Sequence, residues 1–267
     1  MAGDHKWTVC PKLRPTARMR LFCFPYAGVG ISAFRGWAED ADPAIEVCAV
    51  QLPGRESRLR ERPFSSMDEL IPPLVEALSG LLDRPYVLYG HSLGARIAFE
   101  TARAFRRSGR RPPTHLFAGA SPAPQLPWPH PLMHRLPEDD FLSEIQTRYG
   151  GIPRLVMEDP ELRAALVPAL RADITIMETY RYRPDAPLDL GITAFAGTRD
   201  PMVTPAAIAE WRHQATDGFR LENLDGDHFF TQSARHRLLE AVRTTMAGRG
   251  LHKEPLDSPW ALTGTHP

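Results

Sequence analysis

Three side chains of this sequence have the types and the order needed for nucleophilic catalysis. Ser92 is the centre of the pentapeptide Gly-His-Ser-Leu-Gly, residues 90–94, which lies between a β-rich run and a helical pattern. A serine hydroxyl is a weak nucleophile at neutral pH, so it needs a base, and a carboxylate must hold that base in the correct tautomer. The order Ser92, Asp200, His228 predicts these three roles: nucleophile, orienting carboxylate and base.

The positions of the two partners fit this prediction. Asp200 follows the strand-like run ITAFAG, and His228 follows the run FRLENL in the loop DGDHFF. Asp225 and Asp227 are closer to His228 in sequence, but residues so near in one loop rarely reach round to Nδ1 of the same imidazole. Each residue also has a simpler interpretation, as a turn aspartate before Pro201 and a solvated loop histidine, and the shared order favours catalysis.

An acyl-transfer reaction also needs two N–H donors aimed at the developing oxyanion. Backbone amides are sufficient for this role. We expect one donor to be the amide of Leu93, at the start of the helix after Ser92, and the other to be the amide of Ala27 in the loop FPYAGVG.

The elements that must position these groups follow an α/β order. Short apolar runs alternate with amphipathic stretches, as a parallel sheet covered by helices requires. A helix with one apolar stripe is expected from residue 93 to about residue 107. The predicted class is a mostly parallel sheet flanked by helices, with strands at residues 19–25, 45–53, 86–89, 115–119, 192–197 and 219–224.

Residues 121–189 lack the strand-like runs found elsewhere. We interpret this segment as a helical lid inserted in a domain spanning residues 19–246. One lid helix is expected over residues 138–149 and a second from Asp159-Pro160, where an N-cap precedes a proline at the first turn. Pro168 is expected to kink or divide the second helix. Residues 1–18 and 247–267 lack a sustained period, so both are expected to be flexible tails.

The composition limits the kinds of partner that the sequence predicts. Lys plus Arg and Asp plus Glu are both 32, so no global field gathers nucleic acid or an anionic membrane. No apolar stretch reaches membrane-spanning length. Three scattered cysteines are too few for a disulfide framework or a metal cluster, and the four-residue spacing of His130 and His134 is attributed to surface positions. We expect a cytoplasmic monomer without cofactor or metal.

Four segments together resemble a known family. They are FPYAG at 24–28, QLPGRE at 51–56, YGHSLGA at 89–95 and GDHFF at 226–230. This combination is similar to the type II thioesterases that accompany polyketide and nonribosomal peptide synthases. A lid segment, residues 170–182, is also similar to that family, and the resemblance spans about residues 19–242. One departure is Val29, where the family usually has a second glycine.

The resemblance implies an α/β-hydrolase fold, a catalytic triad of Ser92, Asp200 and His228, and oxyanion amides at Ala27 and Leu93. It also implies a partner: an acyl or peptidyl carrier protein whose phosphopantetheine arm bears the acyl group. The expected role is editing of such synthases, with release of a finished chain as a related activity. Arg55 is expected to line the entrance or pair with a carboxylate.

Other functions are compatible with the same motifs. A serine triad does not distinguish thioesters from oxygen esters, so a medium-chain fatty acyl thioesterase and a small-molecule carboxylesterase are alternatives. Acyl transfer to an internal nucleophile is another. A binding protein of the same fold without activity is the alternative from a different class, and the complete set of Ser92, Asp200 and His228 argues against it.

Overall fold

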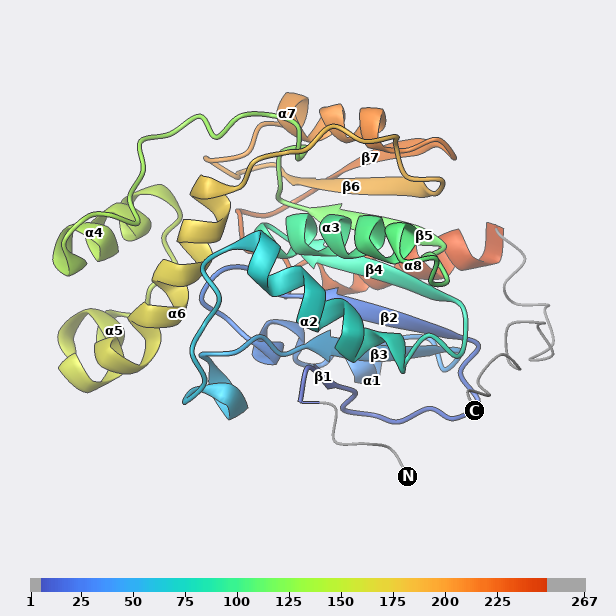
Figure 1. Ribbon diagram of the computed structural model, residues 1–267, viewed down its shortest axis with the longest axis horizontal. Helices are drawn as coiled ribbons and strands as arrows, with labels where there is room; N and C mark the ends of the chain where they lie inside the picture. The colour runs from blue at the N-terminus through green and yellow to red at the C-terminus, as the bar shows by residue number, and fades with distance from the viewer. Residues whose placement is uncertain (1–5, 249–267) are drawn as a thin grey trace.

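The computed structural model describes residues 6–248, which contain a single seven-stranded sheet (Figure 1). The strand order is β1-β3-β2-β4-β5-β6-β7, and all neighbours pair in parallel except β1 and β3. The strands are β1 (Thr8–Val9), β2 (Met19–Phe24), β3 (Ile45–Val50), β4 (Tyr86–His91), β5 (His115–Gly119), β6 (Gly191–Gly197) and β7 (Phe219–Leu224).

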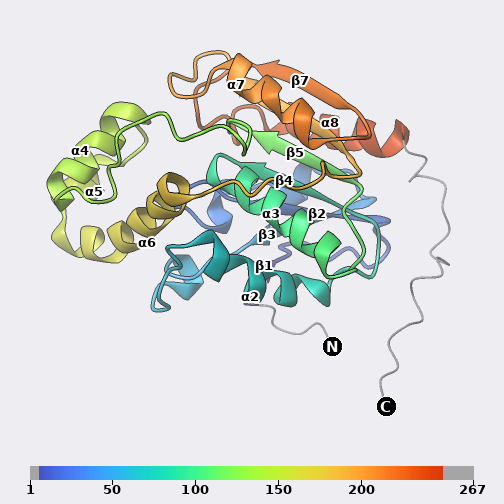
Figure 2. The same ribbon diagram turned by 45° about the horizontal axis from the view of Figure 1, so that its top comes forward.

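Helices cover both faces of the sheet, as the apolar runs predicted. The pair α2 and α3 lies on one face, and α1 and α8 lie on the other (Figures 1 and 2). Strands buried on both faces are mostly apolar, which explains the apolar runs in the sequence; the exceptions Arg20 of β2 and Glu46 of β3 form a buried ion pair. The helices are α1 (Trp37–Asp40), α2 (Met67–Ser79), α3 (Leu93–Arg107), α7 (Pro205–Ala209) and α8 (Arg235–Gly248), with 3-10 turns η1 (Ile31–Phe34), η2 (Glu56–Arg58) and η3 (Glu210–Gln214).

Residues 6–17 were expected to belong to a flexible tail, but they contain strand β1. Thr8 pairs with Val50 and Val9 with Ala49, in antiparallel register at the edge of the sheet. The same register brings Cys10 to Cys48, and these two cysteines form a disulfide. A two-residue strand has no readable period, so neither the strand nor the disulfide could be predicted from spacing. The tail predicted from residue 247 lies outside the described residues except for the last two residues of α8.

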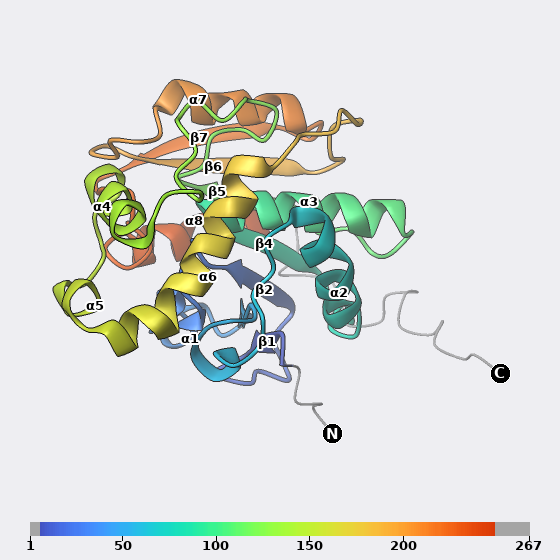
Figure 3. The ribbon, with the colours of Figure 1, turned by 60° about the vertical axis from the view of Figure 1, so that its left-hand side comes forward.

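The segment between β5 and β6 contains three helices at the carboxyl ends of the strands, the expected position of the lid (Figures 1 and 3). Asp159 caps the last of them by accepting hydrogen bonds from the amides of Glu161 and Leu162. Pro168 does not divide that helix, and the short middle helix was not predicted. The lid helices are α4 (Glu138–Arg148), α5 (Arg154–Glu158) and α6 (Pro160–Thr179).

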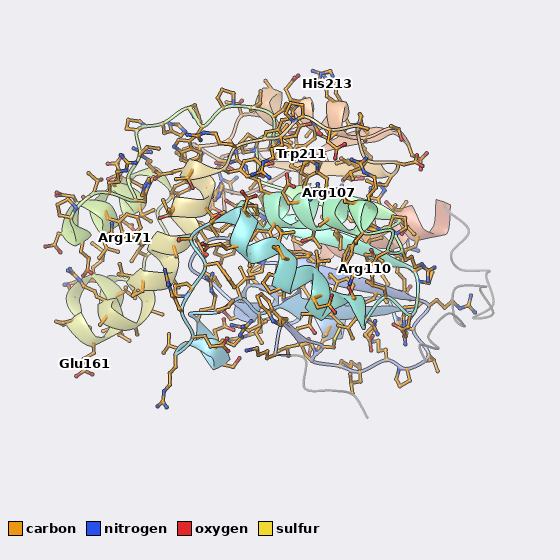
Figure 4. The ribbon with its side chains drawn as sticks, in the orientation of Figure 1. Arg107, Arg110, Glu161, Arg171, Trp211 and His213 are labelled. Atoms are coloured by element: carbon orange, nitrogen blue, oxygen red, sulfur yellow. A yellow bond between two sulfur atoms is a disulfide. The ribbon has the colours of Figure 1, made fainter. Side chains whose placement is uncertain are left out.

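Polar contacts inside the lid tie its helices to the segment that precedes α4. The His134 Nδ1 atom pairs with the buried carboxylate of Glu178, so the prediction that His134 is a surface residue is wrong. Arg171 of α6 donates to the carbonyls of His134 and Leu136 and stacks over the ring of Phe141 (Figure 4). The lid therefore has its own network of contacts.

Candidate active site

Ser92 lies on a sharp turn between β4 and α3, in backbone geometry that few residues adopt. Its φ of 54° and ψ of −116° place it in a strained region, and its amide donates to the Gly119 carbonyl at 2.8 Å. A Cβ on Gly90 would lie 2.2 Å from the Gly94 oxygen, and one on Gly94 would lie 2.1 Å from the Phe24 oxygen. Both positions must therefore be glycine for the turn to form.

Ser92, His228 and Asp200 lie in one hydrogen-bonded chain. The Nε2 atom of His228 is 3.0 Å from Ser92 Oγ, and its Nδ1 atom is 2.8 Å from Asp200 Oδ2. The other oxygen of Asp200 accepts from the amides of Met202 and Val203. Burial would raise the pKa of Asp200, but these hydrogen bonds and the facing His228 lower it below its ordinary value. Asp200 therefore stays ionised beside the imidazole.

The nearer aspartates of the same loop have other partners. Asp225 forms an ion pair with Arg199, and Asp227 accepts a hydrogen bond from the amide of Phe229. The Nδ1 atom of His228 meets Asp200 and neither of these loop neighbours, as predicted.

His91 supports the loop of His228 from beneath, a contact that sequence reasoning missed. Its Nε2 atom is 2.6 Å from the His228 carbonyl oxygen, and its Nδ1 atom is 3.1 Å from Tyr89 Oη. Complete burial, with the charge of His228 nearby, lowers the pKa of His91 to about 3, so the ring is neutral. Because a carbonyl only accepts, Nε2 carries the proton and Nδ1 accepts from Tyr89.

Ala27 and Leu93, whose amides are predicted to bind the oxyanion, both belong to segments beside Ser92. Leu93 is the first residue of α3, so its amide has no acceptor within the helix. Ala27 lines one cavity together with Ser92 and His228. Gly28 has a φ of 77°, and a Cβ there would lie 2.9 Å from Leu170 Cδ1, so Gly28 needs to be glycine whereas Val29 is tolerated.

A buried ion pair connects this loop to the lid. Arg55 binds both carboxylate oxygens of Asp173 on α6, and the two side chains are 4% and 1% exposed. Asp173 Oδ2 also accepts the amide of Gly28 at 2.8 Å. Arg55 thus pairs with a carboxylate, one of its two predicted positions, and Asp173 joins the lid to the loop of Ala27.

An apolar cavity extends from Ser92 under the lid and is formed mainly by residues of the lid helices and of the loop between α4 and α5. It encloses about 810 Å³ of space, part of which is open to solvent. Such a lining suits a hydrocarbon chain. Its apolar lid residues are Leu142, Ile145, Ile152, Val156, Leu166, Val167, Leu170, Ile174 and Met177.

A second cavity meets Ser92 and His228 from the other side, and its lining is more polar. Tyr149 and Met177, like Ser92 and His228, line both cavities. Arg96 and Trp128 line the second cavity alone.

Across residues 6–248, no group of three or more His, Cys, Asp or Glu side chains could hold a metal ion. No helix in that part of the chain is both long and apolar enough to cross a bilayer.

Known proteins are similar to this chain in sequence and in fold. The family model of the thioesterase domain matches residues 19–246. The gramicidin S biosynthesis protein GrsT of Aneurinibacillus migulanus is 38% identical, over 88% of this chain and 92% of its own. Among solved structures, the RedJ thioesterase of the prodiginine pathway in Streptomyces coelicolor is 40% identical, with a TM-score of 0.78 over 88% of each chain.

A third relative carries a more specific description. The type II thioesterase BorB from the borrelidin biosynthetic cluster is 33% identical, with a TM-score of 0.79 over 91% of this chain and 97% of its own. The match to the family model covers most of the chain and includes all the residues of the Ser92 site. This chain therefore belongs to the thioesterase family, and it is a thioester hydrolase of the α/β-hydrolase fold.

Proposed function

We propose that this chain is a stand-alone type II thioesterase that releases acyl groups from the phosphopantetheine arm of acyl or peptidyl carrier proteins. The hydrogen-bonded chain of Ser92, His228 and Asp200 beside an apolar, lid-covered cavity carries this proposal. The description of BorB as a type II thioesterase and of GrsT as a gramicidin S biosynthesis protein supports the class and the setting. The role we propose is editing of a polyketide or nonribosomal peptide synthase in the cytoplasm.

In the proposed reaction, Ser92 Oγ attacks the thioester carbonyl while His228 Nε2 takes its proton. The negative charge that develops on the carbonyl oxygen accepts hydrogen bonds from the amides of Leu93 and Ala27. Asp200 stabilises the imidazolium. The tetrahedral intermediate collapses, the C–S bond breaks, and His228 returns the proton to the departing sulfur.

Water completes the cycle by attacking the acyl-enzyme. His228 accepts a proton from that water, the C–O bond to Ser92 breaks, and the serine hydroxyl is restored. The products are a free carboxylic acid and the carrier's free thiol. The buried Asp200 keeps His228 in the tautomer that presents an unprotonated Nε2 to Ser92 in the resting enzyme.

The test is release of acyl groups from a panel of acylated carrier proteins, followed by mass spectrometry. The native protein is expected to release them, and Ser92→Ala should lose that activity by a factor of about a thousand or more, as removal of a triad member does. Ser108→Ala is the matched control, because this serine lies at the far end of the same helix and only caps it.

Each other result would reject the proposal in a defined way. Hydrolysis of simple oxygen esters, with carriers left loaded, would identify a carboxylesterase. If the protein neither releases acyl groups from carriers nor cleaves esters, it would be identified as a binding protein. Release that persists in Ser92→Ala would remove Ser92 from the mechanism.

A further inference from the structure

The second cavity beside Ser92 contains a buried cation without a carboxylate partner. Arg96 is 3% exposed and lines this cavity together with Ser92 and His228. In the described part of the chain, no Asp or Glu lies within ion-pairing distance of its guanidinium, and none lines the cavity. Burying an unpaired charge is costly, so such a residue needs either a structural or a functional compensation.

The position of Arg96 directs its side chain toward the nucleophile. It lies in the first turn of α3, four residues after Ser92, which is the N-cap of that helix, and both residues line the second cavity. Helical side chains lean toward the helix N-terminus, which is the end where Ser92 lies. A group held by Arg96 would therefore lie close to the scissile thioester.

Part of the compensation is structural. One Arg96 nitrogen donates to the Met177 carbonyl at 3.3 Å, in the last turn of α6, and the guanidinium lies 5.5 Å from the ring centre of Tyr180. A guanidinium carries five N–H donors, and this contact uses one of them. The cation also faces the negative end of the α6 dipole. These contacts hold the side chain but leave most of its donors unused.

A second donor without a partner lies in the same lining. The indole N–H of Trp128 is buried and has no acceptor within residues 6–248. A buried N–H without an acceptor loses the hydrogen bond that it makes with water in the unfolded chain. Two residues distant in sequence, one on α3 and one at the start of the lid, thus line one small space next to Ser92, and each carries a donor without an acceptor in the described part of the chain.

We propose that Arg96 and Trp128 form a subsite for a carboxylate carried by the acyl group, so that the enzyme favours thioesters of short dicarboxylic acids. A carboxylate is the ligand that accepts several hydrogen bonds and neutralises a guanidinium. Hydrocarbon acyl chains would use the apolar cavity instead. This inference rests on the proposed thioesterase function, and it adds a substrate class to the same site.

The test compares succinyl and butyryl groups on one carrier protein, because the two chains have four carbons and differ in the terminal carboxylate. The readout is the ratio of their kcat/KM values. The native enzyme is expected to favour succinyl by about tenfold to a hundredfold, the range of a charge-assisted hydrogen bond. In Arg96→Met, which keeps the length of the side chain, the ratio should fall to about one.

Two further variants separate recognition from folding. Trp128→Phe keeps the ring without its N–H, so the ratio should fall by about threefold. Arg103→Met is the matched control: Arg103 is a buried arginine on the same helix that pairs with Glu100 and lies outside the second cavity. It should lower the melting temperature and keep the native ratio.

The outcomes are distinct. A native ratio of one or less, with butyryl released, overturns the subsite and leaves the thioesterase intact. An unchanged ratio in Arg96→Met would mean that Arg96 only caps α6, and this result also overturns the subsite. Failure of the native enzyme to release either group rejects the proposed function, and the subsite with it.

Discussion

At the scale of single residues, His91 shows how a buried side chain supports the loop that carries His228, the proposed base. It donates one hydrogen bond to the backbone of His228 and accepts one from Tyr89, and it can do both only as a neutral ring. The residue between the first glycine and Ser92 therefore holds the loop that carries the base.

The neutral state of His91 makes the fold sensitive to acid. Its pKa is about 3 in the folded protein against an ordinary value of 6.5, so the unfolded chain binds the proton more tightly. Stability from this group is complete above about pH 6.5 and is lost as the pH falls from there toward 3, by about 1.4 kcal/mol per pH unit. The free energy of unfolding, measured in urea at pH 7 and pH 5, should therefore fall by about 2 kcal/mol more in the native protein than in His91→Gln.

The glutamine variant keeps a donor for the His228 carbonyl but cannot titrate in this range. His213→Gln is the matched control, because His213 is an exposed histidine far from the sheet core (Figure 4). It should follow the native profile. Equal losses in the native protein and in His91→Gln would show that His91 does not resist protonation.

At the scale of elements, the lid and the loop of Ala27 are joined by one side chain. Asp173 on α6 accepts a hydrogen bond from the amide of Gly28 and also forms an ion pair with Arg55. We therefore expect the position of the lid helix to affect the neighbouring amide of Ala27. Asp173 is on this basis a positioning residue for the predicted oxyanion site, since it acts through the backbone of the loop.

Replacing Asp173 tests this link between lid and loop. Asp173→Leu leaves Arg55 buried without a partner, which should cost about 3 to 5 kcal/mol of unfolding free energy. The double variant Arg55→Met with Asp173→Leu removes both charges and should recover most of that stability. Its kcat should stay at least about tenfold below native, because Gly28 still lacks its acceptor.

Stability and kcat are measured on the same three proteins, by urea unfolding and by acyl release. If the double variant regained native kcat along with its stability, the role of Asp173 would be purely structural. A kcat that stays low in a stable protein separates positioning from folding.

At the scale of the whole molecule, β1 forms one edge strand of the sheet, and a disulfide next to it links that edge to β3. The bond between Cys10 and Cys48 spans 38 residues and lies at the edge farthest from β6 and β7, whereas Ser92 follows the central strand β4. The edge contributes to stability and lies apart from the chemistry.

Loss of the disulfide should lower stability and leave catalysis unchanged. Closing a loop of this length contributes about 4 kcal/mol in the chain-entropy account, so Cys10→Ser should reduce the unfolding free energy by about this amount. Its kcat/KM for acyl release should remain within about twofold of native. A reductant should destabilise the native protein and not the variant, and no effect of reductant on either would mean that the bond does not form.

The sequence by itself determined the elements whose signals are local. Strands buried on both faces are mostly apolar, so five runs predicted β2 to β6, and a sixth run predicted the partly exposed edge strand β7. The glycine-flanked serine predicted the turn before α3. The order of Ser92, Asp200 and His228 predicted residues that the fold brings into hydrogen-bonding distance. Parallel strands bring their carboxyl ends to one edge, which is why order along the chain was informative.

Only the tertiary structure decided the contacts between residues distant in sequence. Asp173 meets Gly28 across 145 positions, Arg96 meets Met177 across 81, and His91 meets His228 across 137. Nothing in the local pattern of α3 or α6 distinguishes these side chains from ordinary buried or surface ones. Their partners are set by how the lid packs over the sheet, because a buried polar group takes the partner that the packing brings to it.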